Sequence, residues 1–106
     1  MPHVRNAARL KWRFKVVLGS GTSFTVDVST GGFCTEVMRP LPPATRVQGS
    51  LEGFGRKVPF AGRVAWSSPG DPSLNLRGRM GISFTGVGPG IVDLLSTHSS
   101  LLRQAH

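Results

Sequence analysis

Apolar and polar residues alternate along most of the chain, which is the pattern of β-strands with one buried face. The first such run covers residues 10–18, and glycine and serine at residues 19–22 then predict a tight turn. Alternation resumes over residues 23–29, so we predict a β-hairpin in which residues 10–18 pair with residues 23–29. The positions expected to face its core are Leu10, Trp12, Phe14, Val16, Leu18, Phe24, Val26 and Val28.

Four further strands are predicted from the same alternation, at residues 33–37, 47–51, 58–66 and 80–84. Residues 39–43 contain three prolines, which lack the amide donor that a central strand needs, and they predict a crossing loop. Residues 53–55 predict a turn, and residues 67–73 a loop. Trp66 lies in phase with the apolar face of its strand, as Trp12 does, so we expect both rings to pack in the core.

The spacing changes after Pro89, a residue that suits the first turn of a helix. Apolar residues then recur three and four positions apart, which predicts one amphipathic helix over about residues 89–103. We expect its aliphatic stripe to pack on the barrel or on a second copy of the chain, as in a homodimer, with His98 at the polar edge. The stripe consists of Ile91, Leu94, Leu95, Leu101 and Leu102.

Six short strands followed by one helix predict an all-β fold, a small six-stranded antiparallel β-barrel with one C-terminal α-helix. Closure of the sheet would remove its edge strands. The chain has 106 residues, which is room for one domain. We expect a flexible basic arm over residues 1–9 and a single barrel domain over residues 10–106.

Charge narrows the range of partners. Thirteen Lys and Arg against five Asp and Glu give a net charge of +8, which favours nucleic acid, nucleotide phosphates or acidic protein surfaces. Residues 1–15 hold five of the basic residues and no acid. No apolar run is long enough for a signal core or a membrane span, and the single Cys34 cannot form an intramolecular disulfide. We expect a cytoplasmic protein without membrane insertion.

The usual enzyme motifs are missing from the sequence. It contains no P-loop, no nucleophile elbow, no HExxH motif and no local pair of carboxylates, so we expect neither an enzyme nor a metal or cofactor. His3, His98 and His106 lack metal-ligand spacing. We expect Cys34 to be a small buried apolar residue, with redox sensing as the alternative.

One segment could read a guanine base. Asp27 and Ser29 stand two residues apart at a predicted strand end and should therefore point to the same side. A carboxylate can accept from the two N–H donors on the Watson–Crick edge of guanine, and a hydroxyl can add a contact. Gly31 and Gly32 let the backbone turn closely. The same residue types also form Asx and Ser turns for structural reasons alone, so the pattern by itself leaves both interpretations open.

Residues 27–33 resemble the Asp/Asn-x-Ser-x-x-Gly motif of PilZ domains, the bacterial receptors of cyclic di-GMP. The proline loop, the strand at residues 62–66 and the strand at residues 81–84 before a terminal helix are similar too, so the resemblance covers residues 5–104. It implies a six-stranded β-barrel. It also implies cyclic di-GMP as the ligand, bound by the side chains and backbone of Asp27, Ser29, Gly31 and Gly32.

PilZ receptors also carry an Arg-x-x-x-Arg motif just before the first strand, whose arginines hold the guanine and the phosphates. This chain offers Arg5 with Arg9, or Arg9 with Arg13. Because Arg13 falls within the predicted strand, we favour Arg5 and Arg9 and keep Arg13 as a further ligand-binding candidate. The spacing from Arg9 to Asp27 is shorter than the family usually shows.

Three functions remain open. The first is a cyclic di-GMP receptor whose arm orders on binding and signals to an effector protein in bacterial motility or surface behaviour. The second is a PilZ-like adaptor that contacts proteins without binding the nucleotide. The third is a small basic nucleic-acid-binding barrel, against which we count the predicted burial of Trp12 and Phe14, because stacking platforms need exposed rings.

Overall fold

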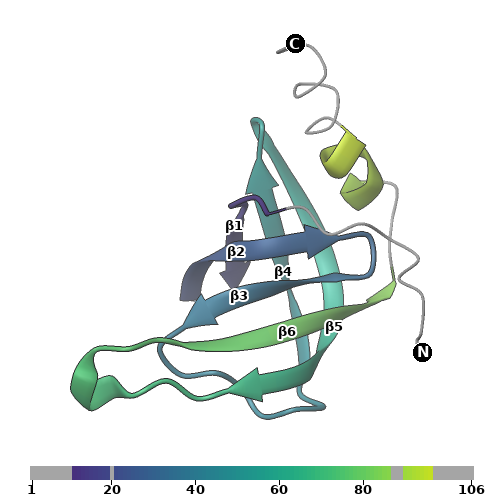
Figure 1. The fold of residues 1–106 in the computed structure, drawn as a ribbon. Helices are drawn as coiled ribbons and strands as arrows, with labels where there is room; N and C mark the ends of the chain where they lie inside the picture. Colours follow the sequence, from purple (N-terminus) through teal and green to yellow (C-terminus); the bar gives the residue numbers. More distant parts are fainter. Residues whose placement is uncertain (1–10, 20, 87–89, 97–106) are drawn as a thin grey trace, which may run out of the picture.

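The computed structural model describes residues 11–19, 21–86 and 90–96 (Figure 1). Six strands form one closed antiparallel barrel, and residues 90–96 are helical. The strands are β1 (Lys15–Leu18), β2 (Gly21–Ser29), β3 (Gly32–Val37), β4 (Arg46–Gly53), β5 (Arg56–Ser68) and β6 (Gly78–Gly86), with a short 3-10 helix, η1 (Pro72–Leu74), between the last two. The predicted all-β barrel with one C-terminal helix is therefore confirmed.

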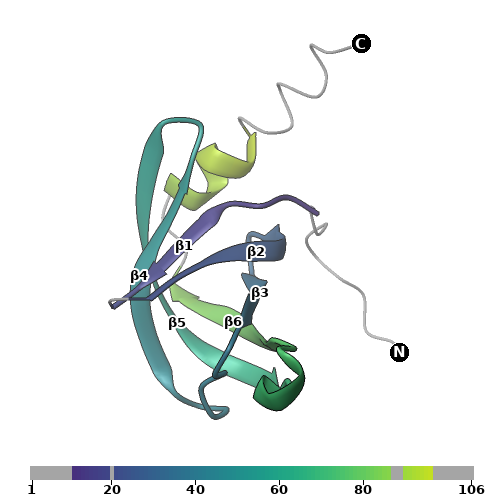
Figure 2. The ribbon, with the colours of Figure 1, turned by 90° about the vertical axis from the view of Figure 1, so that its left-hand side faces the viewer.

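The order of the strands around the barrel differs from their order in the sequence. Around its wall the strands lie in the order β1, β2, β3, β6, β5, β4, and β1 closes the ring by pairing with both β2 and β4 (Figures 1 and 2). The long β3–β4 connection contains the prolines and crosses from one side of the ring to the other, as predicted. Closure brings β6, from the far end of the sequence, between β3 and β5.

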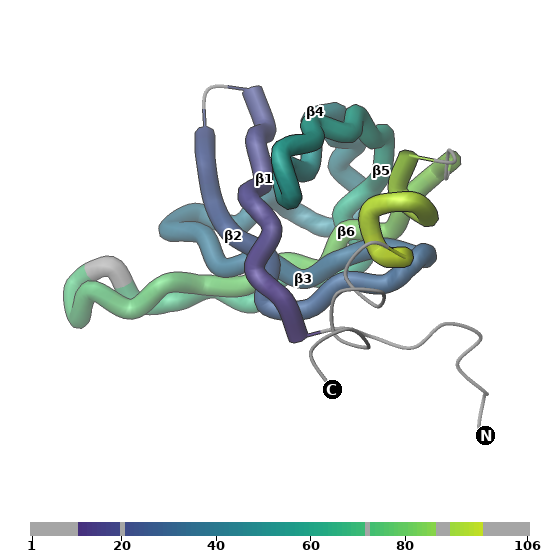
Figure 3. The backbone as a smooth tube through the Cα atoms, turned by 90° about the horizontal axis from the view of Figure 1, so that it is seen from above, coloured from purple at the N-terminus to yellow at the C-terminus, as the bar shows by residue number. Residues whose placement is uncertain are grey.

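The core fills the barrel and continues onto the helix. Ile91, Leu94 and Leu95 of residues 90–96 belong to the same apolar cluster as the strand residues (Figure 3 shows the helix from above). This part of the predicted stripe packs on its own barrel, and the rest of the predicted helix, with His98, Leu101 and Leu102, lies outside the described residues. The cluster also contains Phe14, just before β1, and the strand residues Val16, Val28, Phe33, Val47, Leu51, Val58, Phe60, Val64, Met80 and Ile82.

The first strand is shorter than predicted, because β1 begins at Lys15 and not at residue 10. Just before it, the Phe14 N–H donates to the Thr25 side-chain Oγ1 at 2.8 Å, so a side chain replaces the backbone partner that a ladder needs. Trp12 is 39% exposed, and its ring stacks on Phe54 with the centroids 6.0 Å apart. The prediction that Trp12 packs in the core is therefore wrong.

The inward phase of β2 also differs from the prediction. Phe24, expected in the core, is 43% exposed, and Thr25 is buried instead. The register shifts between Thr25 and Asp27, as at a β-bulge, and the extra residue moves the first half of the strand onto the opposite face. The buried hydroxyls of Ser23 and Thr35 have partners, since Thr35 Oγ1 lies 2.8 Å from both Ser23 Oγ and the Phe24 carbonyl oxygen.

A second register shift, between Val64 and Trp66, has the same effect on β5. Trp66 was predicted to be buried, yet it is 46% exposed and lies on the outer face against Gly81 of β6. A Cβ atom on Gly81 would stand 2.2 Å from the indole Nε1, so the glycine is what allows the ring to lie on the neighbouring backbone.

No helix within the described ranges is long and apolar enough to cross a membrane.

Candidate functional site

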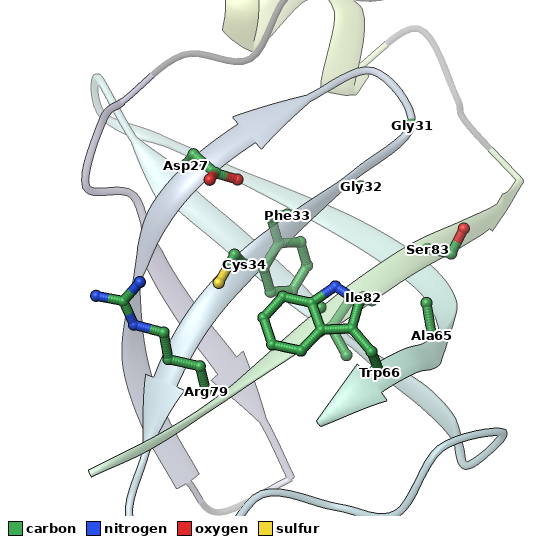
Figure 4. A pocket seen from close by; sticks show the side chains of 11 residues that line it. Asp27, Gly31, Gly32, Phe33, Cys34, Ala65, Trp66, Arg79, Ile82 and Ser83 are labelled. Carbon is green, nitrogen blue, oxygen red and sulfur yellow. The ribbon is translucent and has the colours of Figure 1, made fainter. Parts of the chain in front are cut away.

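A cleft of about 410 Å³ opens on the outer face of the barrel across β2, β3, β6 and β5 (Figure 4). Asp27 and the turn at residues 31–32 form one side of it, and Trp66 with Ala65 forms the other. Arg79 and Ser83 of β6 also line the cleft. The predicted guanine-reading segment therefore lies at a real concavity.

Strand pairing fixes what lies between the two sides. Asp27 is the register partner of Cys34, Cys34 of Gly81, and Gly81 of Trp66, so the four residues form one row across four strands. Figure 4 shows the Trp66 ring reaching from β5 across β6 toward Cys34. Because Gly81 has no side chain, the indole lies on the β6 backbone, and the small Cys34 stands between it and Asp27 in the row.

The turn after Asp27 is held from several directions. Ser29 is only 4% exposed, and its Oγ accepts a hydrogen bond from the Gly31 N–H at 3.1 Å. The Gly31 carbonyl accepts from the Phe84 N–H at 2.9 Å, which ties the turn to β6. A Cβ atom on Gly32 would stand 1.9 Å from the Ile82 carbonyl oxygen, so only glycine fits there.

Asp27 and Ser29 of the motif stand two residues apart in β2, on either side of a core residue. Asp27 and Ser29 pair outward with Cys34 and Gly32, while Val28 between them is fully buried in the core. For Ser29 the structural interpretation holds as well, since its oxygen closes the turn. The motif thus combines a carboxylate at the cleft with a hydroxyl that holds the adjoining backbone.

The three arginines expected at the ligand do not all fall within the described chain. Arg5 and Arg9 lie outside the described residues. Arg13 is exposed, and its guanidinium carbon lies 5.0 Å from the centroid of the Phe24 ring on the outer face of β2. Residues 11–14 run beside β2, because Thr25 donates to the Trp12 carbonyl and the Phe14 carbonyl accepts from the Thr25 N–H at 2.9 Å.

A further arginine lines the cleft and was not predicted. Arg79 of β6 is the register partner of Glu36 on β3, and its guanidinium is 2.9 Å from the Glu36 carboxylate. Both side chains are about half exposed, at 52% and 42%. Arg79 therefore stands at the edge of the cleft with its charge partly balanced.

Trp66 was not predicted at the cleft either, because unbroken alternation along residues 58–66 predicts that its ring faces the core. The available signal was the glycine at residue 81, whose lack of a side chain leaves room for a ring on the outer face. Cys34 is buried, with 6% exposure, as predicted, and it also forms part of the cleft floor. Among the described residues, no three His, Cys, Asp or Glu side chains gather in one place.

Comparison with known proteins finds a matching family model and similar solved structures. The family model of the PilZ domain matches residues 3–98. The structure of the Bacillus subtilis inhibitor of motility MotI/DgrA is similar, with a TM-score of 0.74 and 14% sequence identity, over 98% of this chain and 52% of that one. The structure of Escherichia coli YcgR in complex with c-di-GMP matches with a TM-score of 0.71 and 19% identity, over 95% of this chain and 47% of that one.

The chain thus spans about half the length of these two solved proteins. At such low identity the likeness shows the fold, and it agrees with the barrel and helix described above. The search of curated proteins found no match.

Proposed function

The chain belongs to the PilZ domain family, and from this premise we propose that the cleft between Asp27 and Trp66 binds cyclic di-GMP. The domain would be a binding module, not an enzyme, that passes the state of its ligand to an effector protein in motility or surface behaviour. The structure of YcgR holds c-di-GMP, and MotI is named an inhibitor of motility, which supports both parts of the proposal.

One observation carries the proposal: the Asp27 carboxylate and the Trp66 indole stand at opposite ends of one row of paired residues. Guanine offers two N–H donors on its Watson–Crick edge and a flat π-face. A carboxylate accepts those donors, and an exposed indole stacks on the face. The fixed turn at Ser29, Gly31 and Gly32 holds the backbone close to where the sugar and phosphate of the same nucleotide would lie.

The basic arm would complete the site from the β2 side. Arg5 and Arg9, with Arg13, would bond the phosphates and the opposite edge of guanine through their bidentate forks. Lys11 is the first described residue, and Arg9 lies two residues before it, at most about 7 Å of extended chain. We propose that residues 1–9 order on the ligand while residues 10–106 serve as the rigid domain.

The exposure of two tryptophans bears on the nucleic-acid alternative. The expected burial of the aromatic rings counted against that function, and Trp12 and Trp66 are exposed. Trp12, however, already stacks on Phe54, which leaves Trp66 as the exposed ring at the cleft. A single ring beside a carboxylate suits one base better than a strand of successive bases.

Calorimetric titration of the full chain with cyclic di-GMP tests the proposal, with single-stranded DNA as the competing ligand. We expect saturable binding of cyclic di-GMP and no displacement by the DNA. Absence of binding at 100 μM ligand, at which a site of about −5.5 kcal/mol is half filled, would refute the receptor function and favour the adaptor without ligand. Displacement by DNA at equal nucleotide concentration would favour the nucleic-acid function.

A further inference from the structure

Two arginines face each other on the outer wall of the barrel. They lie next to the cleft between Asp27 and Trp66, which is called the nucleotide cleft below. Arg46 of β4 and Arg63 of β5 are direct register partners, and both side chains are exposed. Like charges directly opposite one another in a sheet destabilise the pair. An arrangement of this kind is favourable when an anion lies between the two guanidinium groups.

Among the described residues, no acidic side chain forms an ion pair with Arg46 or Arg63. Glu52 lies on the same strand as Arg46 but six residues away, about 20 Å along the strand, and is opposite Lys57. Glu36 is paired with Arg79, and Asp71 accepts from the N–H of Ser73 at 3.1 Å. Of the other acids, Asp93 lies on the helix of residues 90–96 and Asp27 lies at the nucleotide cleft.

The surroundings of the two arginines form a concavity with further polar groups. A cleft of about 670 Å³ is lined by Arg46 and Arg63 together with Gln48 and Thr85. The amide and the hydroxyl add hydrogen-bond donors beside the two forks. Two guanidinium groups and neutral donors on one concave surface suit a phosphate group, whose oxygens accept bidentate bonds.

This cleft adjoins the first one. Ser83 lines the nucleotide cleft and is the register partner of both Gly32 and Arg63, and Arg63 is the partner of Arg46. Adjacent strands lie about 4.8 Å apart, so the backbones of Arg63 and Arg46 lie about 5 and 10 Å from that of Ser83. The arginine pair is therefore on the β5 side of the nucleotide cleft, away from β2.

We propose that Arg46 and Arg63 form a second phosphate-binding site, which holds a phosphate group between their guanidinium forks with Gln48 and Thr85 as additional donors. The phosphate belongs either to the nucleotide in the adjoining cleft or to a separate phosphate-bearing molecule. The first of these two sources rests on the proposed function, whereas the phosphate site itself does not.

The test uses the full chain, the double variant Arg46→Gln/Arg63→Gln, and a control double variant with the same change in net charge. Arg39→Gln/Arg56→Gln is that control, because both residues are exposed and lie outside both clefts. Pyrophosphate is the first probe. Its binding is measured through changes in the backbone amide chemical shifts in NMR spectra. We expect shifts centred on residues 46, 48, 63 and 85 in the wild type and the control, and their loss in the double variant.

Thermal melting at low salt gives a second readout that needs no ligand. Arg63→Gln should raise the melting temperature by about 1–4 °C, because it removes the repulsion within the pair. Added pyrophosphate should raise the melting temperature of the wild type and not that of the Arg46→Gln/Arg63→Gln variant. Pyrophosphate shifts that are absent, or that persist in this double variant, would overturn the proposal.

Titration with cyclic di-GMP then identifies the source of the phosphate. If the nucleotide supplies it, the double variant should lose affinity by roughly tenfold or more, and the control should not. Equal nucleotide affinity in the wild type and the double variant, with pyrophosphate binding lost in the variant, would assign the site to a separate phosphate-bearing molecule. Pyrophosphate binding without any wild-type binding of cyclic di-GMP would refute the proposed function and leave the phosphate site in place.

Discussion

Two neighbouring clefts on the outer wall of this barrel differ in how they are built. The cleft at Asp27 and Trp66 has a defined shape, because the adjoining turn is fixed through Ser29, Gly31 and Gly32. The cleft at Arg46 and Arg63 instead presents two exposed cationic side chains on paired strands. Shape with placed acceptors can distinguish one base from another, whereas paired charge recognises the phosphate common to all nucleotides.

Because the two clefts are built differently, substitutions that change folding stability can be distinguished from substitutions that change ligand binding. At the fixed turn, a single side chain serves either the fold or the ligand, so substitutions there should divide cleanly into the two classes.

The largest expected effect is on folding, at the turn itself. Gly32→Ala should lower the free energy of unfolding by about 3 kcal/mol, because its Cβ would stand 1.9 Å from the Ile82 carbonyl oxygen and force β3 and β6 apart. Gly31→Ala is the control, since its Cβ would meet only Ser29 Oγ at an ordinary 3.7 Å. Urea unfolding measures both variants, and equal stability would show that the turn is not held by this close approach.

The next effect is on affinity. Asp27→Ala should weaken cyclic di-GMP binding by roughly 30-fold, about 2 kcal/mol, because the guanine N–H donors lose a charged acceptor. Asp71→Ala removes the same charge from the loop that contains η1 and should leave affinity within about twofold. Calorimetry gives the affinities and circular dichroism confirms the folds. A loss of stability without a loss of affinity in Asp27→Ala would assign this carboxylate to the turn alone.

A somewhat smaller loss of affinity is expected at the other end of the row. Trp66→Ala should weaken the nucleotide complex by about 1.5 kcal/mol, roughly tenfold, through the lost stacking surface. Trp66→Phe keeps a ring over Gly81 and should recover most of the affinity. Quenching of tryptophan fluorescence on titration of the wild type would be reduced in Trp66→Phe, which has Trp12 alone. Unchanged affinity in Trp66→Ala would remove the indole from the site.

The smallest expected effect concerns the ion pair between Glu36 and Arg79, at the edge of the cleft that Asp27 lines. Glu36→Gln releases Arg79 and should raise nucleotide affinity about two- to fivefold, while the free energy of unfolding falls by less than about 1 kcal/mol. Glu52→Gln is the control with the same charge change, since Glu52 is opposite Lys57 and lines neither cleft. A similar gain in both variants would show a general effect of net charge.

Much of the barrel could be predicted from alternation alone. Residues 33–37, 47–51 and 80–84 lie within β3, β4 and β6, with Phe33, Leu51 and Ile82 facing the core as expected. No extra residue is inserted within the predicted range of any of these three strands. A period of two is then a sufficient guide to the buried face.

The errors fall where a register shift adds a residue to a strand. Phe24 and Trp66 each lie next to such a shift, and each faces outward although its sequence position predicted the core. Nothing in the local composition marks the shift, because its cause is the pairing with another strand. Trp12 was misplaced for a related reason, since Phe54, the ring on which it stacks, is more than forty residues away in the sequence.

The sequence by itself determined the class of fold, the number of strands, the C-terminal change to helical spacing and the candidate residues Asp27, Ser29, Gly31 and Gly32. Each of these follows from local periodicity or from a motif within a few residues. Only the tertiary structure brought Trp66 and Arg79 to the cleft of Asp27, and Arg46 opposite Arg63. Barrel closure decides these neighbours, because hydrogen bonding between strands distant in sequence sets which outward side chains share one face.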